Sequence, residues 1–257
     1  MEIAGLVPAA GLGSRLSPLP CSKELFPVGF GPHPEHGEPH PKVVSQYLLE
    51  QMQRAGAKQV YFVLRKGKWD IPAYFGDGSQ LSLHLAYLLM QNPNGTPFSL
   101  NQAYDFVQDK QVLFGFPDIL TGLEDPFSPL LQKQERTQAD VVLGLFKIKR
   151  PHSWDMVATA PDGEVTALEM KSTSTTRSFG WAIACWQPSF TLFMHRHLQH
   201  LEQQMSASGQ VKEISVGAVI QAAIYNGLQV QSVCFPGSSC LDMGTPEDLR
   251  EAISTLT

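Results

Sequence analysis

Two glycines and two basic residues follow one another closely near the start of the chain. Gly11 and Gly13 come soon after the apolar run Ile3–Val7, and Arg15 and Lys23 follow them. Glycines at such a place let the backbone turn tightly and bring N–H groups against a ligand, while the two cations supply positive charge. This spacing predicts a site for a polyphosphate. An ordinary strand-to-helix turn with two exposed cations is the alternative.

Three more charged residues stand where a strand or a turn would present them to a ligand. Asp118 follows an apolar run that ends at Phe116, Lys171 follows another apolar run, and Asp242 lies just before a Gly-Thr-Pro sequence. The carboxyl end of a parallel strand lies on the ligand-binding edge of a sheet, which favours a metal or phosphate role for Asp118. From the residues alone, each of the three could also be an ordinary turn or surface residue.

Strands and helices alternate in the pattern that would position these side chains. After Ile3–Val7, apolar and β-branched runs predict strands at Val60–Leu64, Leu83–Leu88, Val112–Phe116, Val141–Ile148, Val165–Met170, Trp181–Trp186 and Gln229–Cys234. Helical patterns predict helices at Ser45–Ala55, Asn101–Val107, Pro126–Thr137, Ser189–Gln204 and Val216–Asn226, with one more starting at Thr245. This alternation favours an α/β fold with a mostly parallel sheet and helices on both faces.

The segment Gly29–Pro41 interrupts the alternation, because it is rich in proline, glycine and histidine. Such a composition predicts an extended loop insertion. His33, His36 and His40 have a spacing that could bind zinc, but the absence of an ordered scaffold favours a solvated loop instead. Its place in the sequence would also allow the loop to act as a lid over the site.

The segment Pro8–Val28 resembles the signature of the sugar-phosphate nucleotidyltransferases. That signature reads Ala-(Ala/Gly)-Gly-x-Gly-(Thr/Ser)-Arg-Leu-x-Pro-Leu and continues as Pro-Lys-x-Leu-x-Pro-Val, with Ser22 here replacing the second motif's first proline. Gly76–Gln80, the stretch around Gly95 and the C-terminal Cys240–Leu249 resemble segments of glucose-1-phosphate thymidylyltransferases and their relatives. The resemblance extends from Ile3 to about residue 253.

The resemblance implies a Rossmann-like fold of the glycosyltransferase-A type, formed as one domain by residues 1–257. It also implies that an NTP and a sugar 1-phosphate react to give an NDP-sugar and pyrophosphate, with Mg²⁺ as the cofactor. The catalytic residues implied are Arg15 and Lys23, and the metal ligands are Asp118 and Asp242. Lys171 and Glu169 would bind the sugar phosphate. The nucleotide would be bound by Ala10, Gly11, Leu12, Gly13, Ser14 and Gly95.

Besides Ser22, three positions depart from the family pattern in ways that bear on substrate choice or activity. Met90 stands where the family has a glutamine that reads the base, Pro117 replaces a glycine, and Met170 replaces a glutamate that contacts sugar hydroxyls. These changes leave the base and the sugar open. They also motivate an alternative, a catalytically weak relative that binds nucleotide or sugar phosphate as a regulator. A second alternative, a glycosyltransferase that consumes an NDP-sugar, is disfavoured by the glycine loop and Lys23.

The composition is typical of a soluble globular protein and argues against several other classes of protein. A net charge of −5 gives no sign of a nucleic-acid-binding surface, and no stretch approaches the length of a membrane span. The N-terminal apolar run is short and lacks a basic start, so we expect no signal peptide. Four cysteines without a Cys-x-x-Cys spacing predict free thiols and a cytoplasmic protein. The sequence leaves a homo-oligomer open.

Overall fold

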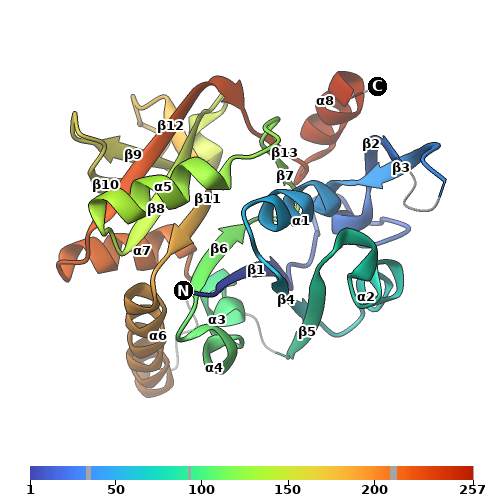
Figure 1. The fold of residues 1–257 in the computed structure, drawn as a ribbon. Helices are drawn as coiled ribbons and strands as arrows, with labels where there is room; N and C mark the ends of the chain where they lie inside the picture. Colours follow the sequence, from blue (N-terminus) through green and yellow to red (C-terminus); the bar gives the residue numbers. More distant parts are fainter. Residues whose placement is uncertain (33–35, 92–93, 209–212, 257) are drawn as a thin grey trace.

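The computed structural model describes residues 1–256 apart from 33–35, 92–93 and 209–212. Within these residues, nine strands form one mixed sheet (Figure 1). They are β1 (Ile3–Ala9), β4 (Gln59–Arg65), β5 (His84–Met90), β6 (Gln111–Gly115), β8 (Val141–Lys147), β9 (Asp155–Thr159), β10 (Val165–Met170), β11 (Phe179–Trp186) and β12 (Val230–Ser239). Strand β9 was not predicted from the sequence.

Parallel pairing dominates the first half of the chain and antiparallel pairing the second half. The main path through the sheet runs β10-β9-β11-β6-β1-β4-β5, and β8 and β12 extend it from β11. Strands β1, β4, β5 and β6 are mutually parallel, whereas β11 is antiparallel to both β6 and β8. Because parallel strands end at the same edge, the segments that follow β1, β4 and β6 are brought together there.

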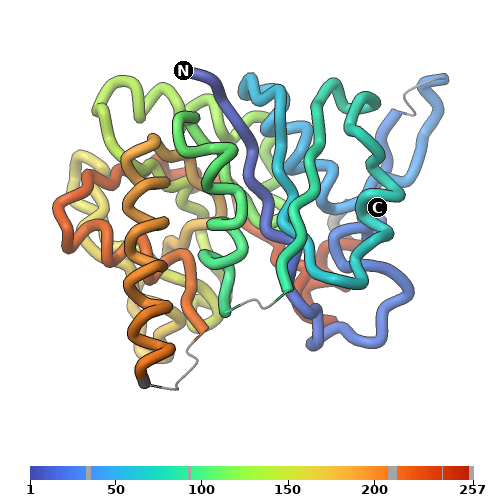
Figure 2. The backbone as a smooth tube through the Cα atoms, turned by 90° about the horizontal axis from the view of Figure 1, so that it is seen from below, coloured from blue at the N-terminus to red at the C-terminus, as the bar shows by residue number. Residues whose placement is uncertain are grey.

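Helices cover both faces of this sheet, as the sequence predicted. The helices are α1 (Val44–Arg54), α2 (Asp70–Phe75), α3 (Thr96–Asn101), α4 (Tyr104–Val107), α5 (Phe127–Thr137), α6 (Pro188–Ser208), α7 (Val216–Tyr225) and α8 (Pro246–Leu256). Short 3-10 turns occur at Lys23–Leu25, Ser79–Leu81 and Pro151–Ser153. Helix α6 runs beside α3 and α4 on one side of the sheet (Figure 2). No helix among the described residues is long and apolar enough to span a membrane.

The alternating side chains of the strands produce two hydrophobic cores, one on each face of the sheet. In β1, Leu6 joins the core that contains residues of α3, α4, α6 and α7, whereas Val7 joins the core formed with α1, α2 and α5. Phe62 in β4 and Trp186 in β11 are completely buried. Burying a side chain of this size contributes about 1.5–3 kcal/mol to stability. The packed sheet therefore gives the loops at its edge a rigid support.

The prediction of a loop at Gly29–Pro41 is wrong for most of that segment. Strands β2 (Pro27–Pro32) and β3 (Pro39–Val43) pair antiparallel, with Gly31 opposite His40. Prolines lack an N–H but are tolerated at strand edges, and both strands of a two-stranded ribbon are edges. His33 lies outside the described residues. Among the described residues, no group of three or more His, Cys, Asp and Glu side chains could hold a metal ion.

Candidate functional site

Two aspartates far apart in the sequence are joined by a small antiparallel pairing. Strand β7 (Ile119–Leu120) follows Asp118, and it pairs with β13 (Leu241–Asp242) so that Asp242 is opposite Ile119. The backbone N–H of Met243 donates to the carbonyl oxygen of Asp118 over 2.8 Å. Asp118 is buried, with 8% of its surface exposed. The structure therefore brings together the two carboxylates that the sequence assigned to a metal.

Each of the two aspartates has a basic residue beside it. The ammonium of Lys23 forms an ion pair with a carboxylate oxygen of Asp118. At Gly244, an ideal Cβ would lie 2.7 Å from Nη2 of Arg15 and 2.8 Å from Oδ1 of Asp242. The guanidinium of Arg15 and the carboxylate of Asp242 thus both lie close to Gly244, where a side chain would displace them. Both predicted catalytic cations therefore lie beside the two predicted metal ligands.

The charges of this group influence one another strongly. Burial and the nearby carboxylate of Asp118 raise the pKa of Asp242, and Lys23 and Arg15 oppose that rise. Burial lowers the pKa of Lys23, but the carboxylates of Asp118, Glu24 and Asp242 outweigh it, so the net shift is upward. Two close carboxylates, one buried and one partly buried, are a suitable donor set for a hard cation. Mg²⁺ commonly takes only one or two protein carboxylates and completes its shell with phosphate and water.

The glycine loop lies next to this cluster. Gly13 has φ +64, a left-handed conformation that favours glycine, and an ideal Cβ there would lie 3.9 Å from Cδ of Lys23. The N–H of Leu16 donates to the carbonyl oxygen of Gly13 over 3.0 Å and closes a turn. Ala10 is buried just after β1, while Gly11, Leu12 and Ser14 are exposed. The loop therefore presents exposed backbone next to the charged cluster.

A pocket of about 310 Å³ lies between this loop and the segment that follows β4. Lys23, Arg65 and Lys68 all line it, together with Leu12 and Gly13 of the glycine loop. Sequence reasoning missed Arg65 and Lys68. A signal was present, because the basic stretch Arg65-Lys66-Gly67-Lys68 directly follows a strand parallel to β1 and so reaches the same edge.

Lys68 is held in this pocket by a buried ion pair. Its ammonium lies 2.6 Å from Oε1 of Glu24, and the two side chains are only 7% and 1% exposed. Burial lowers the pKa of Lys68, while the ion pair with Glu24 opposes that shift. The other carboxylate oxygen of Glu24, Oε2, is buried without a hydrogen-bond partner among the described residues. Glu24, the residue after Lys23 in the signature, thus anchors the segment that follows β4 through its ion pair with Lys68.

Lys171 lies at the same end of the sheet but apart from this cluster. Ile183 of β11 is opposite Gly115, the last residue of β6, so the part of β11 before Ile183 extends beyond the end of β6. In that part of β11, Gly180 pairs with Met156 of β9. Strand β9 in turn pairs with β10, with Asp155 opposite Met170. The charged neighbour of Lys171 is Asp155, whose pKa is raised by burial and lowered by Lys171.

The other residues linked to substrate choice differ in their surroundings. Glu169 and Met170 were linked to the sugar, and Met90 to the base. The carboxylate of Glu169 accepts a hydrogen bond of 2.6 Å from Nε of Arg177, so it already has a partner. Met170 is 43% exposed and lies directly beside Lys171 in sequence. Met90 is buried, and its sulfur accepts a hydrogen bond of 3.0 Å from the hydroxyl of Ser99. The side chain of Met90 is therefore held in the core.

Gly95 begins α3 in a conformation that only glycine adopts readily. Its φ is +109, and a Cβ there would overlap the backbone of Ile214, just before α7. The N–H of Ile214 donates to the carbonyl oxygen of Asn94 over 3.4 Å. Gly95 therefore lets the start of α3 approach the segment just before α7, on the face of the sheet that carries Phe98.

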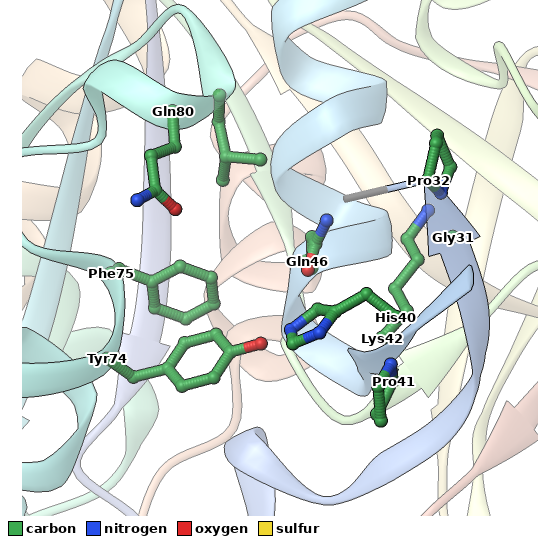
Figure 3. Close-up of a pocket in the computed structure, with 10 residues that line it drawn as sticks. Gly31, Pro32, His40, Pro41, Lys42, Gln46, Tyr74, Phe75 and Gln80 are labelled. Carbon is green, nitrogen blue, oxygen red and sulfur yellow. The ribbon is translucent and has the colours of Figure 1, made fainter. Parts of the chain in front are cut away.

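The β2–β3 hairpin lines a different, smaller pocket of about 130 Å³. His40 and Lys42 of the hairpin face Tyr74 and Gln80 across it, and the hydroxyl of Tyr74 points toward the ring of His40 (Figure 3). No described hairpin residue lines the larger pocket. The described part of the hairpin therefore lines the smaller pocket and not the one beside the glycine loop.

Comparison with known proteins agrees with this geometry. The family model for nucleotidyl transferases matches residues 4–257. The low-salt glycan biosynthesis nucleotidyltransferase Agl11 of Haloferax volcanii is 25% identical over 251 residues, which are 96% of this chain and 64% of that protein. A glucose-1-phosphate thymidylyltransferase of an Actinoplanes species is 24% identical over 254 residues, or 97% of this chain and 76% of that protein.

The fold is also that of solved structures. A crystal structure of UDP-glucose pyrophosphorylase complexed with UDP-glucose has a TM-score of 0.78 at 13% identity, covering 99% of this chain and 98% of the other. This likeness confirms the α/β fold predicted from the sequence. Because the family model covers nearly every residue, from the first strand to the last helix, the chain belongs to the nucleotidyl transferase family.

Proposed function

We propose that this protein condenses an NTP, with dTTP or UTP favoured, with a sugar 1-phosphate to give an NDP-sugar and pyrophosphate. The observation that carries the proposal is the meeting of two cations and two carboxylates beside the glycine loop. The thymidylyltransferase among its relatives supports the choice of a sugar phosphate as the acceptor. Four free cysteines support a cytoplasmic reaction, where thiols stay reduced.

The reaction explains why these residue types are present. An oxygen of the sugar phosphate bonds to the α-phosphorus of the NTP, and the bond from that phosphorus to the bridging oxygen of the β-phosphate breaks. The nucleophile is already an anion, so no general base is required. The protein must instead position the two substrates in line and stabilise the negative charge that passes to the pyrophosphate.

Each residue of the cluster then has one role. Backbone N–H groups of the glycine loop bind the triphosphate, and Arg15 stabilises charge on the leaving pyrophosphate. Lys23 moves from Asp118 to a phosphate oxygen when the nucleotide is bound, and Lys171 seats the sugar phosphate. Asp118 and Asp242 would hold Mg²⁺, which supplies charge neutralisation at the α-phosphate when bound.

A substrate panel tests the proposal directly. Each of the four common NTPs and dTTP is combined with several sugar 1-phosphates, and pyrophosphate release is measured. We expect release with at least one pair and the matching NDP-sugar as the product. A protein that binds these compounds but releases no pyrophosphate would instead be the regulatory relative.

The carboxylates give a prediction about metal dependence. Asp118→Asn and Asp242→Asn should each raise the Mg²⁺ concentration needed for half-maximal activity, because an amide is a poorer ligand for a hard cation. Asp109→Asn is the control, since Asp109 is exposed and precedes β6 at the opposite edge of the sheet. Unchanged magnesium titrations in both site variants would rule out the shared metal site.

Met170 gives a prediction about the sugar. A thioether offers apolar contact and only a weak acceptor, so a hydroxyl buried against it costs about 1–3 kcal/mol. We expect a lower kcat/KM for glucose 1-phosphate than for a deoxy sugar phosphate, and Met170→Glu should shift that ratio toward glucose. Thr166→Glu, exposed on the same strand, is the control. An unchanged ratio in Met170→Glu would show that Met170 does not contact the sugar.

A further inference from the structure

One cation of the larger pocket has no anionic partner within the described residues. Lys23 is paired with Asp118 and Lys68 with Glu24, whereas Arg65 forms no ion pair with any carboxylate that the structure describes. Nε of Arg65 is also buried without a hydrogen-bond partner among the residues that the structure describes. A guanidinium that lines a pocket and has no charged partner there favours an anionic ligand in that pocket.

Asp70 also lines the pocket, and its carboxylate already accepts hydrogen bonds from Ser22. The carboxylate of Asp70 accepts hydrogen bonds from the N–H of Ser22 over 2.6 Å and from its hydroxyl over 2.8 Å. Lys68 donates one of its three N–H bonds to Glu24, which leaves others free to contact a ligand. The pocket therefore combines one unpaired guanidinium with an ammonium that can still donate.

The position of this pocket relative to Lys171 suggests which anion it takes. Lys171 follows β10, which is at one end of the strand order, and Arg65 is the last residue of β4, which is near the other end. Asp118 follows β6, which lies between these two strands. In an in-line displacement the nucleophile and the leaving group lie on opposite sides of the reacting phosphorus. If the sugar phosphate is seated at Lys171, as the proposed function requires, the leaving group departs toward β4.

We infer that Arg65 and Lys68 form a subsite for the β- and γ-phosphates of the NTP and for the pyrophosphate released from them. This inference rests on the proposed function for its orientation. The planar fork of Arg65 can bind two phosphate oxygens at once, whereas Lys68 provides a point charge fixed by Glu24. With the glycine loop on the other wall, the subsite would hold the two outer phosphates from both sides.

Direct binding of inorganic pyrophosphate tests the inference without turnover. Calorimetric titrations at a fixed excess of Mg²⁺ compare wild type, Arg65→Gln and Lys66→Gln. Lys66 is exposed, adjacent in sequence and does not line the pocket, so it is a matched control. We expect Arg65→Gln to raise the Kd by about tenfold or more, as loss of a hydrogen bond to a charged group predicts, and Lys66→Gln to leave it unchanged. Arg65→Lys, which keeps the charge, should recover part of the affinity.

Kinetics of the reverse reaction give a second measurement. Arg65→Gln should raise the KM for pyrophosphate and leave the KM for the NDP-sugar near that of wild type. Equal pyrophosphate affinity in wild type and Arg65→Gln would overturn the subsite, and so would an equal rise of both KM values. If pyrophosphate binds through Arg65 but no substrate pair is turned over, the proposed function is overturned while the anion site stands.

Discussion

Lys23→Ala is expected to lower kcat by about 10²–10³ while the protein remains folded, because one charge-stabilising contact to the reacting phosphates is lost. The ammonium of Lys23 lies in the part of the site where the glycine loop, Asp118 and the pocket meet. Among the described residues, it is the cation that forms an ion pair with a metal-binding candidate. The change should therefore act on turnover more than on the KM for the sugar phosphate.

The measurement is steady-state pyrophosphate release by the purified variant, with thermal unfolding recorded beside it. Lys66→Ala is the matched control, since it removes an exposed cation that is not in the pocket. A Lys23→Ala protein with turnover near that of wild type would exclude the catalytic role. The thermal scan reports loss of folding, so it can be distinguished from loss of catalysis, which pyrophosphate release reports.

Lys68→Met is expected to lower the free energy of unfolding by about 3–5 kcal/mol, which is the usual cost of removing one partner of a buried ion pair. The variant would leave the carboxylate of Glu24 uncompensated, with 1% of its side chain exposed and Oε2 already without a partner. Urea unfolding of wild type, Lys68→Met and the exposed control Lys66→Met provides the comparison.

A double variant distinguishes the ion pair from simple packing. Glu24→Leu combined with Lys68→Met removes both charges, and replacement of a buried pair by apolar residues is often neutral or stabilising. We expect it to regain most of the stability lost in Lys68→Met. If Lys68→Met unfolds within about 1 kcal/mol of wild type, the pair is not holding the segment after β4 in place.

The sequence could predict a polyphosphate site at the glycine loop because the signals for it are local. The apolar run before Gly11, the left-handed position at Gly13 and the cations that follow are all determined within one short segment. The signals for strands and helices are also local. Nearly every strand or helix predicted from the spacing of apolar residues is present in the structure. Hydrophobic periodicity depends on near neighbours, so it can be recognised without the fold.

The prediction of a loop failed at the proline-rich segment, because its composition is typical of a loop but its backbone pairs as two strands. The segment around Gly31 and His40 has the residues of a loop, yet its two halves pair as β2 and β3. Strand β2 also packs with α8. The small cluster of Val28, Val44, Leu120, Met243 and Ala252 is what the hairpin and the last helix bury together. That partner comes from the far end of the chain, so no local pattern could indicate it.

By itself, then, the sequence determined which residues could bind phosphate and metal, and which strands would carry them. Only the tertiary structure decided that Arg65 and Lys68 join the glycine loop in one pocket, and that Glu24 is the buried partner of Lys68. These contacts depend on the parallel register of β1 and β4, in which Ala9 is opposite Leu64. Strand register and the desolvation of a charge are properties of the assembled sheet, because both are set by neighbours that are distant along the chain.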